Sequence, residues 1–298
     1  MKLRDLGKTD LKVSSIGMGC VTFGREIDET TSFEVLDHAF ERGINFFDTA
    51  AVYAQGASET VLGKWITERN VRNKVILATK VHGTQTKEHV IASAEQSLQR
   101  LQTDHIDLFY LHNWDGETPM EETLGALNAL VDSGKVRAIA CSNWQAWQLA
   151  KSLLLCAKGG LRAMDCVQPP YNLVQREIEA DLIPFCADQQ IGVVAYSPLA
   201  AGFLTGKYRR NGDVPKGTRF DVIPAHQPIY FTDHGYAVVE ELSRAAEREG
   251  KSMVQLALGW VLSRPQITSV LIGARNRDQV DQAFESESIG AECAGLFS

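Results

Sequence analysis

The chain has 298 residues, of which 44% are hydrophobic and 22% charged, and this globular composition excludes disordered, collagen-like and coiled-coil proteins. Its formal net charge of −7 argues against binding to nucleic acid or to an anionic membrane, since both attract basic proteins. No signal peptide or membrane-spanning run is evident, and the six cysteines are scattered without a C-x-x-C pair, so we expect a reduced, cytoplasmic protein.

The first elements are expected to be strands. Residues 1–13 contain two short apolar-polar alternations around Gly7-Lys8-Thr9-Asp10, which predicts a β-hairpin. Short apolar runs rich in β-branched and aromatic residues follow, and they predict eight buried strands at 16–19, 44–48, 75–80, 106–112, 136–142, 166–168, 193–197 and 270–273. Their continuous apolar character is typical of a parallel sheet covered on both faces.

Amphipathic helices are predicted between these strands. Apolar residues at steps of three and four line one helix face within 91–101, within 124–131 and within 253–261, and Pro265 stops the last of these helices. Strands and helices therefore alternate, with most strand ends about 30 residues apart. This pattern favours a closed (β/α)₈ TIM barrel over an open doubly wound sheet, and we expect residues 1–298 to form that one domain.

One segment departs from the repeat. Residues 200–235, after the seventh strand, are rich in glycine and proline and predict a long loop without secondary structure. Such loops in compact domains are usually functional. Because this one follows a strand end, we expect it to lie over the C-terminal face of the barrel, where barrel enzymes carry their active sites.

Three ionisable residues, Asp48, Lys80 and His112, end consecutive predicted strands, and Tyr53 follows closely. One such charge often marks only the return of the chain to water, but three at matching positions favour a shared site. A free tyrosine has a pKa of about 10 and is a poor proton donor near neutrality. We expect the Lys80 ammonium to lower that pKa and the Asp48 carboxylate to keep the lysine charged. With a histidine on the same substrate oxygen, this set suits carbonyl reduction.

The segments around these residues resemble the aldo-keto reductase family over essentially the whole chain. The matching segments are Asn45-Phe46-Phe47-Asp48-Thr49-Ala50 with Tyr53, Ala78-Thr79-Lys80, Asp107-Leu108-Phe109-Tyr110-Leu111-His112, Ser142-Asn143, Tyr196-Ser197-Pro198-Leu199 and Ile272-Gly273-Ala274-Arg275-Asn276. The resemblance implies a (β/α)₈ barrel that reduces aldehydes or ketones with NADPH. It assigns Tyr53 as the general acid, Lys80 and Asp48 as the residues that tune it, and His112 as the residue that orients the carbonyl.

The resemblance also implies a cofactor site. Asn143 and Gln168 match residues that hold the nicotinamide carboxamide, and Tyr196 matches an aromatic residue that stacks on the ring. Gln279 and Gln282 fall toward the adenine, and Ala283 stands where the family often has asparagine. The other residues expected near the cofactor are Gly19, Cys20, Val21, Asp48, Ser142, Ser197, Pro198, Leu199, Gly202, Lys207, Gly273, Ala274 and Arg275.

The cofactor phosphate is expected after the eighth strand. Neither G-x-G-x-x-G nor a P-loop is present. In residues 273–279, Gly273 and Ala274 allow close backbone approach, free amides at a helix start would face an anion, and Arg275 adds a forked donor. An arginine there favours NADP over NAD. The competing interpretation is that Asn276 caps a surface helix and Arg275 is solvated.

The residues that would line the substrate-binding site leave the substrate class open. Val21, Phe23, Asn113, Trp114 and Trp144 follow strand ends and are candidates for the wall beside Tyr53 and His112, although the two tryptophans would equally suit packing between loops. An apolar wall favours aryl aldehydes, whereas polar groups such as Asn113 favour a sugar.

Two rival functions remain. A barrel hydrolase or lyase would use Lys80 or Asp48, but a Schiff-base lysine needs an apolar setting without a paired carboxylate. A non-catalytic nicotinamide-binding sensor or regulatory subunit would keep the cofactor site. The intact tetrad of Asp48, Tyr53, Lys80 and His112 favours the enzyme. No metal is expected, because the seven histidines lack ligand spacing. We therefore expect a small-molecule carbonyl substrate, with the oligomeric state left open.

Overall fold

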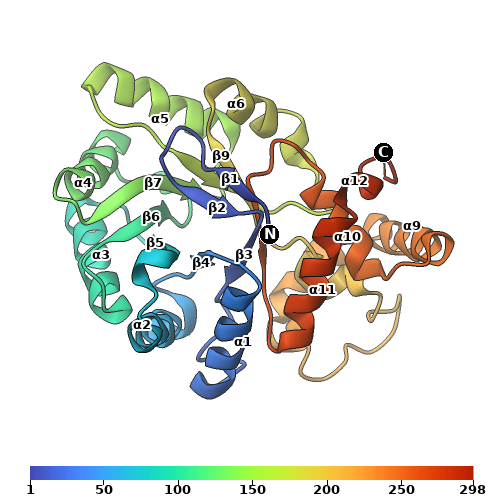
Figure 1. Ribbon diagram of the computed structural model, residues 1–298. Helices are drawn as coiled ribbons and strands as arrows, with labels where there is room; N and C mark the ends of the chain where they lie inside the picture. Colours follow the sequence, from blue (N-terminus) through green and yellow to red (C-terminus); the bar gives the residue numbers. More distant parts are fainter. Residues whose placement is uncertain (298) are drawn as a thin grey trace.

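The computed structural model describes residues 1–297, and this part of the chain forms a closed, eight-stranded parallel barrel (Figure 1). The strands are β3 (Ile16–Gly19), β4 (Phe46–Asp48), β5 (Ile76–Val81), β6 (Ile106–Leu111), β7 (Val136–Ser142), β8 (Cys166–Gln168), β9 (Gly192–Ala195) and β10 (Ser269–Ile272). They follow one another round the ring in chain order, and β10 closes it between β9 and β3. The predicted TIM barrel is confirmed.

The strand boundaries differ from the predicted ones in places. The seventh barrel strand, β9, ends at Ala195, two residues earlier than predicted, and Tyr196 continues it only as an isolated bridge to Pro170. Ser197 cannot extend the strand because its φ of 52° lies in the left-handed region. The second strand, β4, begins at Phe46 rather than at residue 44.

The predicted N-terminal hairpin is also confirmed. Strands β1 (Leu3–Asp5) and β2 (Lys12–Ser14) pair antiparallel. Gly7 in the turn has a φ of 58°, and a Cβ there would lie 2.6 Å from the Asp165 carbonyl oxygen and 2.9 Å from the Gly192 amide nitrogen. Asp165 directly precedes β8 and Gly192 begins β9, so the hairpin covers the N-terminal end of the barrel (Figure 1).

Helices surround the barrel. They are α1 (Glu29–Glu41), α2 (Ala57–Arg69), α3 (Lys87–Leu101), α4 (Met120–Asp132), α5 (Ala146–Gly159), α6 (Leu182–Gln189), α9 (Asp233–Glu249), α10 (Met253–Leu262), α11 (Arg277–Ser288) and α12 (Gly290–Cys293). Helix α10 ends before Pro265, as predicted, and α9 lies outside the ring against α10 (Figure 1). Among the described helices, none combines the length and the apolar character that a bilayer crossing requires.

The segment after β9 is more ordered than the sequence suggested. The expectation of a loop without secondary structure was wrong, because the segment contains η4 (Ala200–Thr205), α7 (Arg219–Val222), η5 (Pro224–His226) and α8 (Gln227–Tyr230). Phe203 is fully buried, and its ring lies 5.3 Å from Phe231, 6.2 Å from Tyr230 and 6.5 Å from Phe220. This aromatic cluster supplies the packing that a structureless loop lacks.

The alternation of side chains along the strands directs the candidate residues inward. Phe46, Ala78 and Tyr110 belong to the core inside the barrel. Their strand neighbours Phe47, Leu77 and Phe109 belong to the other core, between the strands and the helices. Because successive strand side chains point to opposite faces, Asp48, Lys80 and His112 come next on the inward side of β4, β5 and β6. The fold therefore places these three residues at the C-terminal end of the barrel interior.

Candidate active site

A cavity of about 780 Å³ opens at the C-terminal end of the barrel strands. Sites for small molecules and cofactors are typically about 300–1,000 Å³. Tyr53, Asp48 and His112 lie in its wall. The other predicted site residues that line it are Gly19, Val21, Ser142, Asn143, Gln168, Tyr196, Ser197, Pro198, Leu199, Gly202, Lys207, Gly273, Arg275, Gln279 and Gln282.

A buried ion pair lies beneath the cavity. Lys80 Nζ pairs with Asp48 Oδ1 and donates to the Thr49 carbonyl at 2.7 Å, and neither side chain is more than 3% exposed. Burial alone would lower the pKa of Lys80, but the Asp48 carboxylate and the Tyr53 phenol outweigh it and raise that pKa. Burial raises the pKa of Asp48, and the Lys80 charge opposes that rise. Lys80 therefore remains charged at neutral pH, as predicted.

Tyr53 lies next to this pair. Its ring centroid is 5.2 Å from Lys80 Nζ. Burial raises the pKa of Tyr53 above its ordinary value, and the Lys80 charge only partly opposes the rise. The expected lowering of the pKa was therefore wrong for the free protein, because the desolvation that the sequence could not reveal exceeds the effect of the ammonium.

His112 completes the tetrad from β6. Its ring centroid lies 5.8 Å from that of Tyr53 in an edge-to-face arrangement. Burial, assisted by the charges of Lys80 and His82, lowers the pKa of His112 to about 3. His112 is therefore neutral at physiological pH, and its Nδ1 is buried without a hydrogen-bond partner among the described residues. A neutral imidazole can hydrogen-bond a carbonyl oxygen without protonating it.

Polar side chains extend from the tetrad across the floor of the cavity. Gln168 Nε2 donates to Asp48 Oδ2 at 2.9 Å. The Tyr196 hydroxyl donates to Asn143 Oδ1 at 2.7 Å, and Asn143 Nδ2 donates to the His112 carbonyl at 2.9 Å. Asn143 has a φ of 59°, a left-handed conformation that asparagine tolerates better than most residues. These bonds fix the orientation of the three residues predicted to contact nicotinamide.

The far end of the cavity collects positive charge. Arg275 and Lys207 line it, and burial together with the Arg275 charge lowers the pKa of Lys207. Among the described residues, no carboxylate pairs with Lys207. Gly202 has a φ of 91°, and a Cβ there would lie 3.3 Å from Lys207 Nζ, closer than most contacts, whereas a Cβ on Gly273 would face open space. A cation that lacks a paired carboxylate, as Lys207 does here, suits the phosphates of a dinucleotide.

The start of α11 bears on the competing interpretation, in which Asn276 caps a surface helix and Arg275 is solvated. Asn276 caps the helix, its Oδ1 accepting from the Gln279 amide at 3.0 Å. Arg275 is not merely solvated, because its Nη1 donates to the Gly217 carbonyl at 2.9 Å while its side chain lines the cavity. Capping by Asn276 and a position of Arg275 in the cavity wall therefore occur together.

Several predicted residues do not reach the cavity wall. Phe23 is fully buried in the outer core, and Trp144 is 4% exposed and packs edge-to-face on Trp114 at 5.0 Å. Asn113 accepts a hydrogen bond from Asn143 Nδ2 at 3.2 Å. These four substrate candidates do not line the cavity, because loop packing turns them elsewhere. Lys80, Cys20 and Ala274 are fully buried behind the wall.

Other wall residues were missed by the sequence reasoning. They include Val52 and Ile229, which are 44% and 47% exposed, and Arg25, Arg219 and His226. Arg25, Arg219 and Arg275 all lie close to the Glu26 carboxylate, at 2.6, 3.2 and 3.9 Å. This charge cluster joins three separate loops over the cavity. In the sequence, the only sign of these wall residues was Gly217-Thr218-Arg219 in the long segment. That sequence did not reveal where the Arg219 side chain points.

Comparison with known proteins agrees with this site. The profile described as "Aldo/keto reductase family" matches residues 15–291. The chain belongs to the aldo/keto reductase family. Membership makes it an oxidoreductase of the aldo/keto reductase type, and this family generally uses a nicotinamide cofactor. That residues 1–298 form a single domain stays a prediction.

Three relatives illustrate the range of the family. "Uncharacterized oxidoreductase YrpG" of Bacillus subtilis (strain 168) is 34% identical, over 98% of this chain and 93% of its own length. "Aldo-keto reductase YhdN" of the same organism is 34% identical over 96% and 88%. "Probable voltage-gated potassium channel subunit beta" of Arabidopsis thaliana is 32% identical over 97% and 92%. Proteins named for different roles are thus similarly close to this member of the family.

Proposed function

We propose that this aldo/keto reductase is an NADPH-dependent enzyme that reduces an aldehyde or ketone to an alcohol. The observation that carries the proposal is the convergence of Tyr53, Lys80, Asp48 and His112 beside one cavity whose far end holds Lys207 and Arg275. The size of the cavity, the positive charge of Lys207 and the three arginines that share the single Glu26 carboxylate fit a nicotinamide dinucleotide phosphate. When bound, that cofactor would supply the hydride for the carbonyl carbon.

The proton comes from the protein. Tyr53 is the general acid, and its hydroxyl protonates the carbonyl oxygen as negative charge develops there. The Lys80 charge stabilises the phenolate that remains, and Asp48 holds Lys80 in place. Neutral His112 hydrogen-bonds the carbonyl oxygen and orients it.

The remaining residues divide between cofactor and substrate. Asn143 and Gln168 hold the carboxamide, Tyr196 stacks on the nicotinamide ring, and Arg275 selects the 2′-phosphate and hence NADP over NAD. The exposed apolar side chains of Val52 and Ile229 favour an aryl carbonyl, with a sugar as the alternative. The cofactor binds first, because the segment after β9 lies over it. The six free cysteines favour a cytoplasmic location.

The Tyr53→Phe variant tests the proposal. We expect its turnover of an aryl aldehyde, followed by NADPH absorbance, to fall by at least about 100-fold, while NADPH binding followed by fluorescence stays nearly intact. Tyr236→Phe is the matched control, because Tyr236 lies outside the cavity wall and, within residues 1–297, its hydroxyl hydrogen-bonds only to the Arg209 carbonyl, at 3.4 Å. Equal losses of turnover and binding in Tyr53→Phe would mean that Tyr53 is structural.

A second candidate is a nicotinamide-binding regulatory subunit. The relative named as a potassium channel subunit beta supports it. Turnover of a generic aldehyde by the wild type would exclude a purely non-catalytic role, whereas tight NADPH binding without turnover of any carbonyl would favour it.

A further inference from the structure

The backbone that carries Tyr53 adopts an unfavourable conformation. Tyr53 begins η1 (Tyr53–Gly56), and the next three residues, Ala54, Gln55 and Gly56, have φ values of 48°, 56° and 92°. All three lie in the left-handed region, and two of them are not glycine. Such a turn persists only where the surrounding structure holds it.

The first turn of α2, directly after this turn, is tied to the strands that carry the catalytic groups. Ser58 Oγ donates to the Cys20 carbonyl at 2.7 Å and lies 2.8 Å from the hydroxyl of Thr49, the neighbour of Asp48. The Glu59 carboxylate, which is fully buried, accepts from the hydroxyl of Thr79 at 2.5 Å. Thr79 is the neighbour of Lys80. Helix α2 is therefore hydrogen-bonded to the residues next to both members of the ion pair.

Arg100 of α3 completes the attachment. Its Nε donates to Glu59 Oε2 at 2.6 Å. A Cβ on Gly56 would lie 2.8 Å from Arg100 Cδ and 3.0 Å from Arg100 Nε, so the arginine packs directly against the left-handed turn. Neither Glu59 nor Arg100 lines the cavity. Any effect of the pair on the reaction must therefore pass through the turn or through Thr79, the neighbour of Lys80.

We propose that Glu59 and Arg100 are positioning residues for Tyr53. The pair holds the turn at 54–56 against β5 and thereby sets the position of the phenol relative to Lys80. The inference rests on the proposed role of Tyr53 as proton donor. A lysine in place of Arg100 keeps the charge but lacks the planar group that both bonds the carboxylate and covers Gly56, so it does not substitute.

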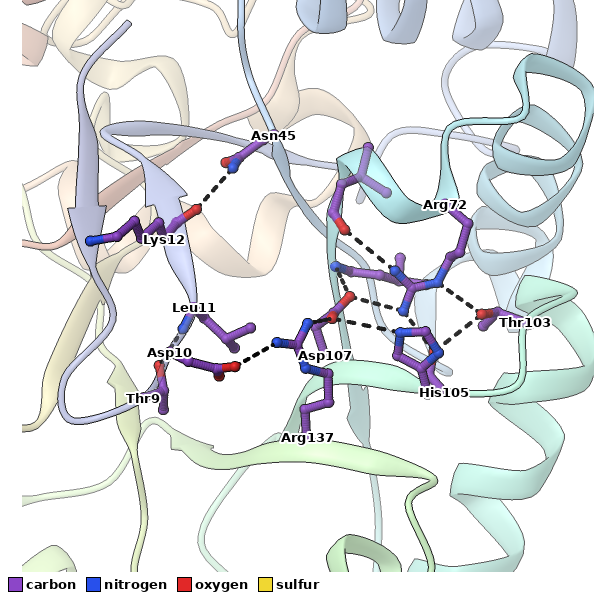
Figure 2. Close-up of polar contacts among 12 residues, drawn as sticks. Thr9, Asp10, Leu11, Lys12, Asn45, Arg72, Thr103, His105, Asp107 and Arg137 are labelled. Carbon is purple, nitrogen blue, oxygen red and sulfur yellow. Dashed lines mark hydrogen bonds and ion pairs between the residues drawn. The ribbon is translucent and has the colours of Figure 1, made fainter.

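Asp107 offers a matched control at the other end of the barrel. Its carboxylate is 1% exposed and lies 2.9 Å from Arg72 Nη2 and 2.7 Å from Arg137 Nη1. Figure 2 shows this cluster beside the hairpin, where Arg137 also contacts Asp10 at 3.1 Å. Asp107 is as buried and as fully paired as Glu59, but the hairpin end of the barrel lies away from Tyr53.

The experiment compares Glu59→Gln and Arg100→Lys with Asp107→Asn. Melting temperature, NADPH affinity, kcat and KM are measured for each protein. We expect Glu59→Gln and Arg100→Lys to lower kcat by about 10- to 100-fold, because small displacements of a catalytic group have effects of this size, with NADPH affinity changed less than about threefold. Asp107→Asn should lower the melting temperature comparably and leave kcat within about twofold. Arg100 is 28% exposed, so Arg100→Lys tests the pair even where Glu59→Gln does not fold.

A second measurement does not depend on turnover. The ionisation of Tyr53 in the cofactor-free protein is obtained by subtracting the absorbance titration of Tyr53→Phe from that of the wild type. The same subtraction is made between Arg100→Lys and the double variant that also carries Tyr53→Phe. We expect the Tyr53 pKa to fall toward its ordinary value in that background, because a loosened turn admits water. Lower melting temperatures with unchanged kcat and an unchanged Tyr53 titration would overturn the positioning role. Undiminished turnover in Tyr53→Phe would instead overturn the proposed function, and the titration would still decide the positioning.

Discussion

Asp48 and Gln168 join opposite walls of the barrel. Asp48 ends β4 and Gln168 ends β8, which lie opposite one another in the closed ring, yet Gln168 Nε2 donates to Asp48 Oδ2 at 2.9 Å. Lys80 pairs with the other carboxylate oxygen. Both oxygens of the buried carboxylate are thus occupied, and its orientation is fixed from three strands.

Removing the amide from this bond should weaken the fold. In Gln168→Met the side chain keeps its approximate size, but Asp48 Oδ2 loses a donor in a buried setting. We expect the free energy of unfolding to fall by about 1–3 kcal/mol. Urea denaturation measures it, and an unchanged midpoint would show that water replaces the amide at no cost.

Removing one partner of the ion pair should lower the free energy of unfolding more than removing both partners. Lys80→Met leaves the buried Asp48 carboxylate without its cation, which we expect to lower the free energy of unfolding by about 3–5 kcal/mol. Adding Asp48→Asn removes the stranded charge and should recover at least about 1 kcal/mol of that loss. Urea denaturation of the two single variants and the double variant gives the coupling, and strictly additive losses contradict the pairing.

His112 should make the fold more sensitive to acid. Burial lowers the pKa of His112 to about 3, while an unfolded histidine titrates near about 6.5. Between these values the unfolded chain binds one more proton than the folded chain at this residue. The free energy of unfolding therefore falls as the pH drops through this window, by up to about 1.4 kcal/mol per pH unit, and this group contributes no slope above it.

The His112→Asn variant isolates this effect. Its free energy of unfolding should be subtracted from that of the wild type at several values between pH 4 and pH 7. We expect the difference to decrease steadily as the pH falls, because only the wild type loses stability through this residue. A difference that is independent of pH would show that His112 is solvated in the free protein.

The strands, but not the loops, could be predicted from the sequence. Continuous apolar runs marked the strands and the points where they end, so Asp48, Lys80 and His112 were placed correctly at the C-terminal ends of consecutive strands. Phe23 and Trp144 follow strand ends, where no period sets the direction of a side chain, and tertiary packing turned both away from the cavity. The predicted direction of the Tyr53 pKa shift was wrong for a related reason, because sequence spacing reveals neighbouring charges but not desolvation.

Arg275 should decide between the two nicotinamide cofactors. Arg275 lines the cavity together with Gly273, and under the proposed function a charge-assisted bond from its guanidinium to the 2′-phosphate would contribute about 1.5–3 kcal/mol. We therefore expect Arg275→Met to weaken NADPH binding by roughly 10- to 150-fold and NADH binding by less than about threefold. Fluorescence titration with both cofactors measures the two affinities.

Arg277→Met is the matched control for this prediction. Arg277 is the first residue of α11 and is exposed outside the cavity wall, so the variant makes the same change of charge at the same helix start. It should leave both affinities within about twofold, because an exposed charge beyond the wall is screened by salt. If Arg275→Met weakens NADPH and NADH binding equally, then Arg275 acts through its bond to the Gly217 carbonyl, holding the segment after β9 in place, and not through the 2′-phosphate.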